Sequence, residues 1–201
     1  MDKNLLEAIK NRRTYYSIGN EKIVTEEKIT NIVQNAIKYT PTSFNSQSGR
    51  AILLFNEHHT KLWDIVKAEL RKILDDEAYE TSKQKIDACF ASGYGTVLYF
   101  EDQNSVKAMQ EQFPLYADNF PLWSLQSSGM LQYIVWTALE LEGLGASLQH
   151  YNPLIDEAVR SEWEVPESYK LISQMPFGKP LNPPDTKDFV PIEDRFKKYG
   201  S

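Results

Sequence analysis

The chain has a single cysteine, Cys89, among its 201 residues, which excludes a disulfide within the chain. Cys89 lies in an apolar stretch, residues 86–91, where a small core side chain is the simplest interpretation. The first residues lack the continuous apolar segment of a signal peptide, and no later stretch reaches the roughly 20 uncharged apolar residues that cross a bilayer. We therefore expect a cytoplasmic protein without a membrane partner.

The usual signatures of catalytic and metal sites are also missing. The sequence has no G-x-S-x-G elbow, no H-E-x-x-H or paired-cysteine motif, no Walker A loop and no G-x-G-x-x-G fingerprint. His58 and His59 open a helix and are expected to form a solvated turn. We therefore predict no catalytic side chain and no metal. The net charge of −6 argues against nucleic acid as a partner.

What is present is typical of a globular protein, with 41% hydrophobic and 25% charged residues. The length suits one domain over residues 1–201. The spacing of apolar residues predicts helices, and short apolar runs predict strands. Because the helices and strands do not alternate regularly along the chain, we expect one α+β domain. Helices are expected near 5–12, 25–37, 62–73, 105–112, 122–141 and 154–160, with another ending at 86–91; strands are expected at 51–55, 95–100 and 169–175, with a turn and short strand at 143–149.

The helix expected at residues 122–141 has little polar surface around its circumference. A helix that is apolar on nearly all sides must be buried on nearly all sides. In a chain of this size, the simplest solution is a central helix that also faces a partner subunit, so we predict a homodimer. The apolar C-terminal tail from Pro180 would pack on something too, and an arm reaching across a dimer is one possibility.

Three polar segments far apart in the sequence are candidates for ligand binding. Arg12–Thr14 could grip a phosphate with charge-assisted bonds, although two arginines after a helix also complement its dipole. Residues 43–47 offer uncharged donors and acceptors, although a solvated loop has the same composition. Residues 195–198 form a basic patch in an acidic chain, and a solvated tail is the alternative.

Taken in order, these segments resemble the nitroreductase family of flavoproteins. That family has an early R-R-S motif, a P-S-x-x-N-x-Q loop, a G-L-G turn after a long helix and a C-terminal basic pair. The counterparts here are Arg12–Thr14, Pro41–Gln47, Gly143–Gly145, and Arg195 with Lys197. The short chain is most similar to the compact branch that holds fungal fatty-acid-repression-type proteins and bacterial copper-induced nitroreductases.

The resemblance implies a nitroreductase-like fold, with a central mixed or antiparallel sheet flanked by helices and an intertwined homodimer with a long buried central helix. It also implies FMN at the subunit interface. The cofactor-binding residues carried over are Arg12, Arg13 and Thr14 for the phosphate and ribityl chain, Arg195 and Lys197 for the phosphate, Ser43, Asn45 and Gln47 from the opposite subunit for the ring and ribityl hydroxyls, and Leu148, Gln149 and His150 along the ring.

The implied function is electron transfer from NADPH or NADH through FMN to a small aromatic acceptor, a nitroaromatic or a quinone, by a ping-pong mechanism. Several aromatic side chains are candidates to line the acceptor slot: Tyr15, Phe44, Phe113, Tyr116, Phe120 and Trp123. Departures from the family pattern include His150–Tyr151 in place of a Glu-Gly pair beside the flavin. A flavin-binding sensory or regulatory protein, a flavin reductase, and a degenerate site without flavin are the alternatives.

Overall fold

The computed structural model describes residues 5–200, and its centre is a five-stranded antiparallel sheet. The strands are β1 (Ile18–Gly19), β2 (Gly49–Phe55), β3 (Gly95–Asp102), β4 (Gly145–Ala146) and β5 (Tyr169–Pro180). Their order is β1-β5-β3-β2, and β4 pairs with β5. The only parallel element among the described residues is an isolated bridge between Thr14 and Ala146, so the sheet is antiparallel rather than mixed.

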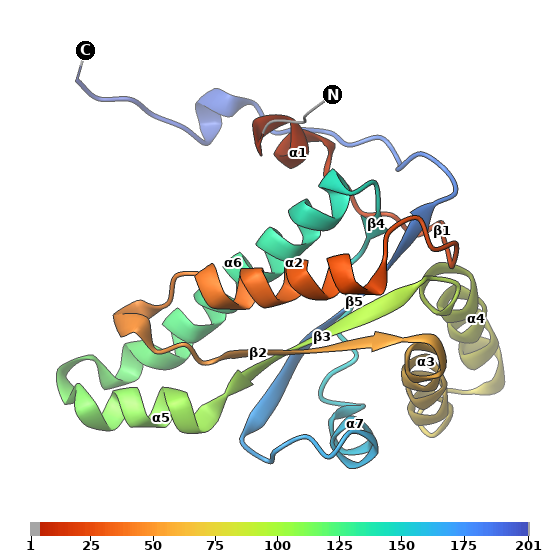
Figure 1. Ribbon diagram of the computed structural model, residues 1–201, viewed down its shortest axis with the longest axis horizontal. Coiled ribbons are helices and arrows are strands. Elements are labelled where there is room, and N and C mark those ends of the chain that lie inside the picture. The colour runs from red at the N-terminus through yellow and green to blue at the C-terminus, as the bar shows by residue number, and fades with distance from the viewer. Residues whose placement is uncertain (1–4, 201) are drawn as a thin grey trace.

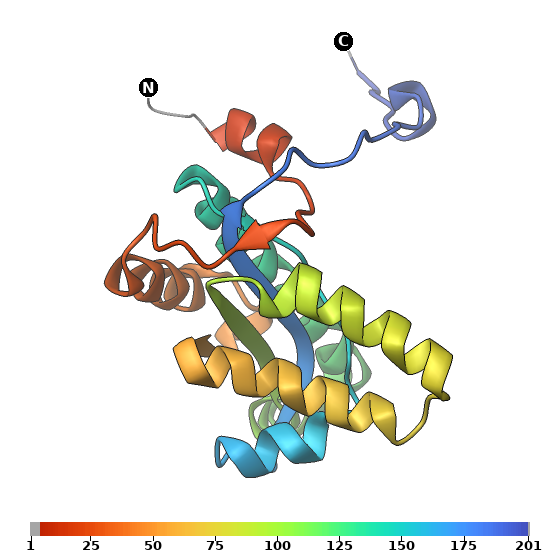
Figure 2. The ribbon, with the colours of Figure 1, turned by 90° about the vertical axis from the view of Figure 1, so that its right-hand side faces the viewer.

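Helices cover both faces of this sheet (Figures 1 and 2). They are α1 (Leu5–Asn11), α2 (Glu26–Tyr39), α3 (Asn56–Arg71), α4 (Asp76–Ile86), α5 (Gln103–Gln112), α6 (Phe120–Leu141) and α7 (Asp156–Glu162), with short turns η1 (Ser43–Asn45), η2 (Asp87–Ala91), η3 (Pro114–Asn119) and η4 (Ile192–Asp194). The sequence therefore predicted the α+β architecture and nearly every element in it, with β1 as the main omission.

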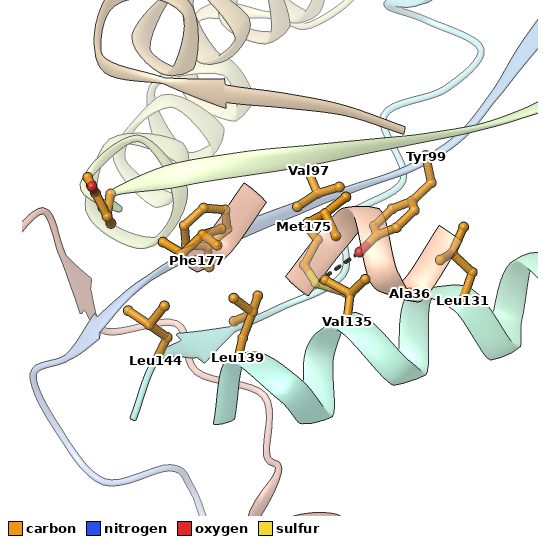
Figure 3. Packing of buried hydrophobic residues seen from close by; sticks show 13 residues of the cluster. Ala36, Val97, Tyr99, Leu131, Val135, Leu139, Leu144, Met175 and Phe177 are labelled. Carbon is orange, nitrogen blue, oxygen red and sulfur yellow. Dashed lines mark hydrogen bonds between the residues drawn. The ribbon is translucent and has the colours of Figure 1, made fainter. Parts of the chain in front are cut away.

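Strand β3 shows how the layers are built, because its successive side chains point to opposite faces. Val97 and Tyr99 belong to a core with α2 and α6, whereas Leu98 and Phe100 belong to a second core with α3 and α7. Figure 3 shows the first core, where the Tyr99 hydroxyl lies 3.6 Å from the Met175 sulfur. Strand β3 is buried along its whole length, which explains its continuous apolar run.

Two local predictions have opposite outcomes. Thr25 does cap α2, since its hydroxyl accepts a hydrogen bond from the Lys28 amide at 3.2 Å. His59, expected in a solvated turn, is instead buried in the core. Its ring lies between Thr96 Oγ1, 2.9 Å from Nδ1, and the Ala91 carbonyl, 3.2 Å from Nε2. A carbonyl only accepts hydrogen bonds, so Nε2 carries the proton and Nδ1 accepts from Thr96.

The single chain buries one face of the long helix, and the prediction that a partner subunit covers the rest stays a prediction. One face of α6 packs on the sheet through Leu131, Val135 and Leu139. The other face exposes large apolar side chains, which are Leu122, Leu125, Met130, Tyr133, Ile134 and Leu141. The sequence reported the apolar character of this helix correctly, but one chain supplies neighbours for only half of it.

After β5, the C-terminal segment extends away from the body of the molecule (Figure 2). It carries exposed apolar side chains at Phe189, Ile192 and Phe196. Among residues 5–200, no helix is long and apolar enough to cross a membrane.

Candidate functional site

Arg12 stands at the end of α1, where its amide donates to the Ala8 carbonyl at 2.8 Å. Its guanidinium carbon lies 4.3 Å from the centre of the Trp136 ring and 5.8 Å from that of Tyr133, both on α6. Stacking of this kind fixes the plane of the guanidinium without using its hydrogen-bond donors. Arg12 Nε is buried and has no hydrogen-bond partner. An anion placed beside it would satisfy this donor.

The next two residues line a hollow of about 230 Å³ together with residues 185–187. Arg13 donates through Nη2 to the backbone carbonyl of Asp185, which holds the start of the C-terminal segment beside the arginines. Lys187 lines the same hollow and adds a third cation. We call Arg12, Arg13, Thr14 and Lys187 the cationic cluster.

The turn after α6 lies directly against this cluster. Thr14 bridges to Ala146, and the Tyr15 amide donates to the Ala146 carbonyl at 3.0 Å. Gly145 is required here, because a Cβ at this position would lie 2.7 Å from the Tyr15 ring. Gln149 continues along β5, exchanging backbone hydrogen bonds with Gln174 at 2.7 and 2.9 Å.

The structure therefore brings two of the predicted segments to one edge of the sheet, Arg12–Thr14 and the stretch Leu148–His150. Within that stretch Leu148 and Gln149 are partly buried, whereas His150 is exposed. Arg195 and Lys197 are not brought to the cationic cluster. Both are exposed on the extended C-terminal segment, which stands off from α1 (Figure 2).

The third predicted segment, Ser43–Gln47, forms a loop with an unusual backbone. Phe44, Asn45 and Gln47 all have positive φ, at 53°, 55° and 47°. Residues with a Cβ rarely adopt a positive φ. Residues that are held in this backbone conformation are often found at functional sites. The strained loop is held from within by Thr42, whose hydroxyl accepts from the Gln47 amide at 3.1 Å.

Arg50 fastens this loop to the sheet. Its Nη1 donates to the carbonyls of Gln47, at 2.6 Å, and Gly49, at 3.0 Å. Its Nη2 pairs with Asp102 at 2.9 Å, and its Nε donates to the Tyr169 hydroxyl at 3.1 Å. Although burial raises the pKa of Asp102, hydrogen bonds from Ser105 and Ser168 and the charge of Arg50 lower it overall. Asp102 is thus a fixed anion that anchors Arg50.

Phe44 also anchors the loop, through contacts with four other aromatic rings. Its ring centre lies 4.6 Å from that of Phe113, 5.4 Å from Phe120 and 5.7 Å from Tyr116, and it stacks on Trp123 at 6.1 Å. Of the aromatic residues predicted to line an acceptor slot, these five therefore gather in one cluster. Tyr15 does not join them, because it packs on Gly145.

In one chain, the cationic cluster and the Ser43–Gln47 loop lie at different points along α6. Arg12 stacks on Trp136, whereas the cavity beside the loop is lined by Ser127 and Ser128. Trp136 stands eight positions after Ser128, which corresponds to about 12 Å along a helix axis. In the single chain, the cationic cluster and the Ser43–Gln47 loop therefore contact different turns of α6.

Sequence reasoning missed Trp136, Lys187 and Arg50. Trp136 reads as one more apolar residue of a long helix, and Lys187 as an ordinary surface lysine, so neither gave a signal. Arg50 directly follows the polar loop, and its position beside Gln47 was a usable hint.

Comparison with known proteins supplies an independent line of information. A model described as the nitroreductase family matches residues 9–179. The chain is 35% identical over 189 residues to nitroreductase FRM2 of Saccharomyces cerevisiae, covering 93% of each chain.

Solved structures of nitroreductase CinD from Lactococcus lactis are also similar. The complex with nicotinic acid is 47% identical with a TM-score of 0.91, and the complex with 4-nitrophenol is 46% identical with a TM-score of 0.88. Each likeness covers 98% of this chain and 100% of the other. A Desulfovibrio desulfuricans protein in complex with FMN has a TM-score of 0.70 at 15% identity, covering 100% of this chain and 99% of that one, a likeness of fold alone.

Proposed function

Because this chain belongs to the nitroreductase family of oxidoreductases, we propose that it uses FMN to transfer electrons from NADPH or NADH to small aromatic acceptors, nitroaromatics or quinones. The CinD structure with 4-nitrophenol supports the acceptor class, since that relative holds a nitroaromatic molecule. Hydride acceptance from the nicotinamide and delivery of electrons to the acceptor are the chemistry that FMN supplies when bound. The polypeptide binds the cofactor, orients it and shields it.

The observation that carries this proposal is the cationic cluster. A chain with a net charge of −6 gathers Arg12, Arg13 and Lys187 around one hollow. The unpaired, buried Arg12 Nε fits a phosphate oxygen, and Thr14 adds a hydroxyl. The phosphate of FMN carries about two negative charges, which this cluster would neutralise. Gln149 and the neighbouring residues Leu148 and His150 would lie along the ring from the same chain.

The second half of the site would come from a second copy of the chain. The loop that carries Ser43, Asn45 and Gln47 meets α6 about 12 Å along the helix axis from the turn on which Arg12 stacks. The exposed apolar face of α6 offers the surface on which two copies would associate. A homodimer would cover that face and bring the loop of one subunit toward the cationic cluster of the other.

The extended C-terminal segment fits the same arrangement. Phe189, Ile192 and Phe196 are exposed in the single chain, and packing across a partner would cover them. Arg195 and Lys197 lie on this segment, so the same docking would carry them to a phosphate. Lys187 already lies beside the arginines of its own chain.

An absorbance spectrum of the purified protein tests the proposal. Bands at roughly 370 and 450 nm would identify the flavin, and anaerobic NADPH or NADH should bleach them. Adding 4-nitrophenol or a quinone to the reduced protein should restore the bands, as a ping-pong mechanism requires. A colourless protein that also fails to take up added FMN would refute the proposal.

A further inference from the structure

Helix α1 gives Arg12 little support of its own. The helix has seven residues and packs against α6 (Figure 1), and among these residues only Ala8 is buried. Arg12 directly follows the last residue of α1 and is partly exposed. An arginine side chain at such a position samples many rotamers, and holding one of them for a ligand has an entropic cost. The contacts that fix this side chain must therefore come from another element.

Helix α6 supplies that support through Trp136. The Arg12 guanidinium carbon lies 4.3 Å from the centre of this ring, whereas the Tyr133 ring, about one turn earlier, is farther away at 5.8 Å. Both distances are within the range of a cation–π contact, and tryptophan is the strongest partner of this kind. Of the two rings, Trp136 therefore makes the main contact with Arg12.

The indole of Trp136 carries a cost that a smaller apolar side chain would avoid. Its Nε1 is buried and has no hydrogen-bond partner within residues 5–200, although the N–H of a buried tryptophan usually finds one. An unpaired buried donor is unfavourable, and a phenylalanine or leucine here would bury no polar atom. The contact of Trp136 with the core between α2, α6 and the sheet requires only an apolar side chain. The indole therefore fits a role that depends on the face of its ring.

The neighbouring arginine is positioned in a different way. Arg13 donates through Nη2 to the backbone carbonyl of Asp185, so one of its donors is already in use. Arg12 is held by the face of a ring, and stacking uses none of the donors on the edge of the guanidinium. Both arginines line the same hollow. A planar fork that is held at a fixed angle matches two oxygens of a phosphate group.

We propose that Trp136 is a positioning residue for the cofactor phosphate: by stacking on Arg12 it holds the guanidinium ready for that group, and it thereby makes the site prefer FMN over riboflavin. Riboflavin has the same ring and ribityl chain as FMN and lacks the phosphate. The inference rests on the proposed function, since it requires that FMN binds at the cationic cluster. Trp136 acts through Arg12, so its effect is confined to ligands that carry a phosphate.

Fluorescence titration of flavin-free protein with FMN and with riboflavin tests this role. Trp136→Leu should weaken FMN binding about tenfold, which is within the range for loss of a cation–π contact. The same variant should leave riboflavin binding unchanged. Trp136→Phe keeps an aromatic face and should therefore lose less FMN affinity than Trp136→Leu. A role in packing alone would weaken the binding of both ligands by the same factor.

A double variant shows whether Trp136 acts through Arg12. In the Arg12→Ala background, Trp136→Leu should cause no further loss of FMN affinity, because the group that Trp136 positions is absent. Trp163→Leu is the matched control. Trp163 is also a partly buried tryptophan, but it follows α7, with its Nε1 3.3 Å from His58 Nδ1, and its replacement should change neither affinity. Thermal melts of all variants check that they fold.

Three results would overturn this inference while leaving the proposed function in place, provided that the wild-type chain binds FMN. They are an unchanged FMN affinity in Trp136→Leu, equal losses of FMN and riboflavin affinity in that variant, and a loss that adds in full to that of Arg12→Ala. A wild-type chain that bound riboflavin as tightly as FMN would also overturn it. A wild-type chain that bound neither flavin would refute the proposed function and this inference together.

Discussion

At the scale of single residues, Arg12 is the most informative side chain, because Trp136 fixes its plane while its Nε lacks a partner. A hydrogen bond to a charged group is worth about 1.5–3 kcal/mol, and its loss corresponds to roughly a 10- to 100-fold change in affinity. We predict that Arg12→Ala weakens FMN binding by this factor and leaves the chain folded. Fluorescence titration of flavin-free protein with FMN measures the change. Unchanged affinity would mean that the phosphate lies elsewhere.

Lys187→Ala and Arg195→Ala form an informative pair beside that variant. Lys187 lines the hollow in the single chain, whereas Arg195 would reach a phosphate only through the docked C-terminal segment. Both should weaken FMN binding, and each by less than Arg12→Ala because neither donates from a stacked, buried position. A loss confined to Lys187→Ala would remove Arg195 from the site.

Single residues also show where sequence reasoning ended. The family pattern assigned Arg12–Thr14 and the stretch after the glycine turn to one ligand, and the structure does bring these two segments to one edge of the sheet. It did not reveal the partners that give each residue its properties. Trp136 beneath Arg12 and Thr96 beside His59 come from other elements, and such neighbours depend on the packing of helices on the sheet.

At the scale of elements, the Ser43–Gln47 loop depends on Arg50, which holds the carbonyl of Gln47 while pairing with Asp102. A lysine keeps the charge but cannot make these bonds at once. We predict that Arg50→Lys lowers the free energy of unfolding by about 1–3 kcal/mol, the value of a few hydrogen bonds. It should also weaken FMN binding, because Asn45 and Gln47 lose their fixed positions. Chemical denaturation and FMN titration measure the two effects.

Two controls isolate the positioning role of Arg50. Arg71→Lys makes the same change at an exposed pair with Asp76 and should alter neither quantity. Val159→Ala, in the core on the far side of the sheet, should destabilise the chain without changing FMN affinity. If Val159→Ala weakened FMN binding as much as Arg50→Lys, the effect would be one of stability alone.

The elements themselves were largely readable from periodicity. Helix α2 followed from its apolar spacing and Thr25 cap, and β3 from a run that is apolar on both faces. Strand β1 was missed because two residues carry no period, and they become a strand only by pairing with Lys179 and Pro180. The positive φ values of Phe44 and Gln47 were equally invisible, since the partners that contact these residues, the Phe113, Phe120 and Trp123 rings and the Arg50 side chain, come from elsewhere in the chain.

At the scale of the whole molecule, the exposed face of α6 predicts association and a shared site. Met130 is 41% exposed on that face, and a glutamate there would place a charge in the interface. We predict that Met130→Glu shifts the protein toward monomer and lowers its flavin content in parallel, as light scattering and absorbance would show. Ile73→Glu, at a position 63% exposed beyond α3, is the control and should change neither. A monomeric Met130→Glu that kept its full complement of flavin would show that each chain forms its site alone.

The dependence of stability on pH combines two buried groups on opposite faces of the sheet. Burial lowers the pKa of His59 from 6.5 to about 4, so between these values only the unfolded chain binds the proton, and stability rises with pH. Burial raises the pKa of Glu101 from 4.5 to about 7, so the folded chain keeps its proton longer, and stability falls with pH. Each shift corresponds to roughly 3 kcal/mol, and the two windows overlap.

We therefore predict that these contributions nearly cancel between about pH 4.5 and 6.5 in the wild-type chain, and that single variants reveal them. His59→Gln leaves the Glu101 effect, so its stability should fall with rising pH relative to wild type. Glu101→Gln leaves the His59 effect, so its stability should rise. The double variant should run parallel to wild type, because it lacks both groups. Urea denaturation at several pH values gives the four curves, and single variants parallel to wild type would mean that neither group is titrating in this range.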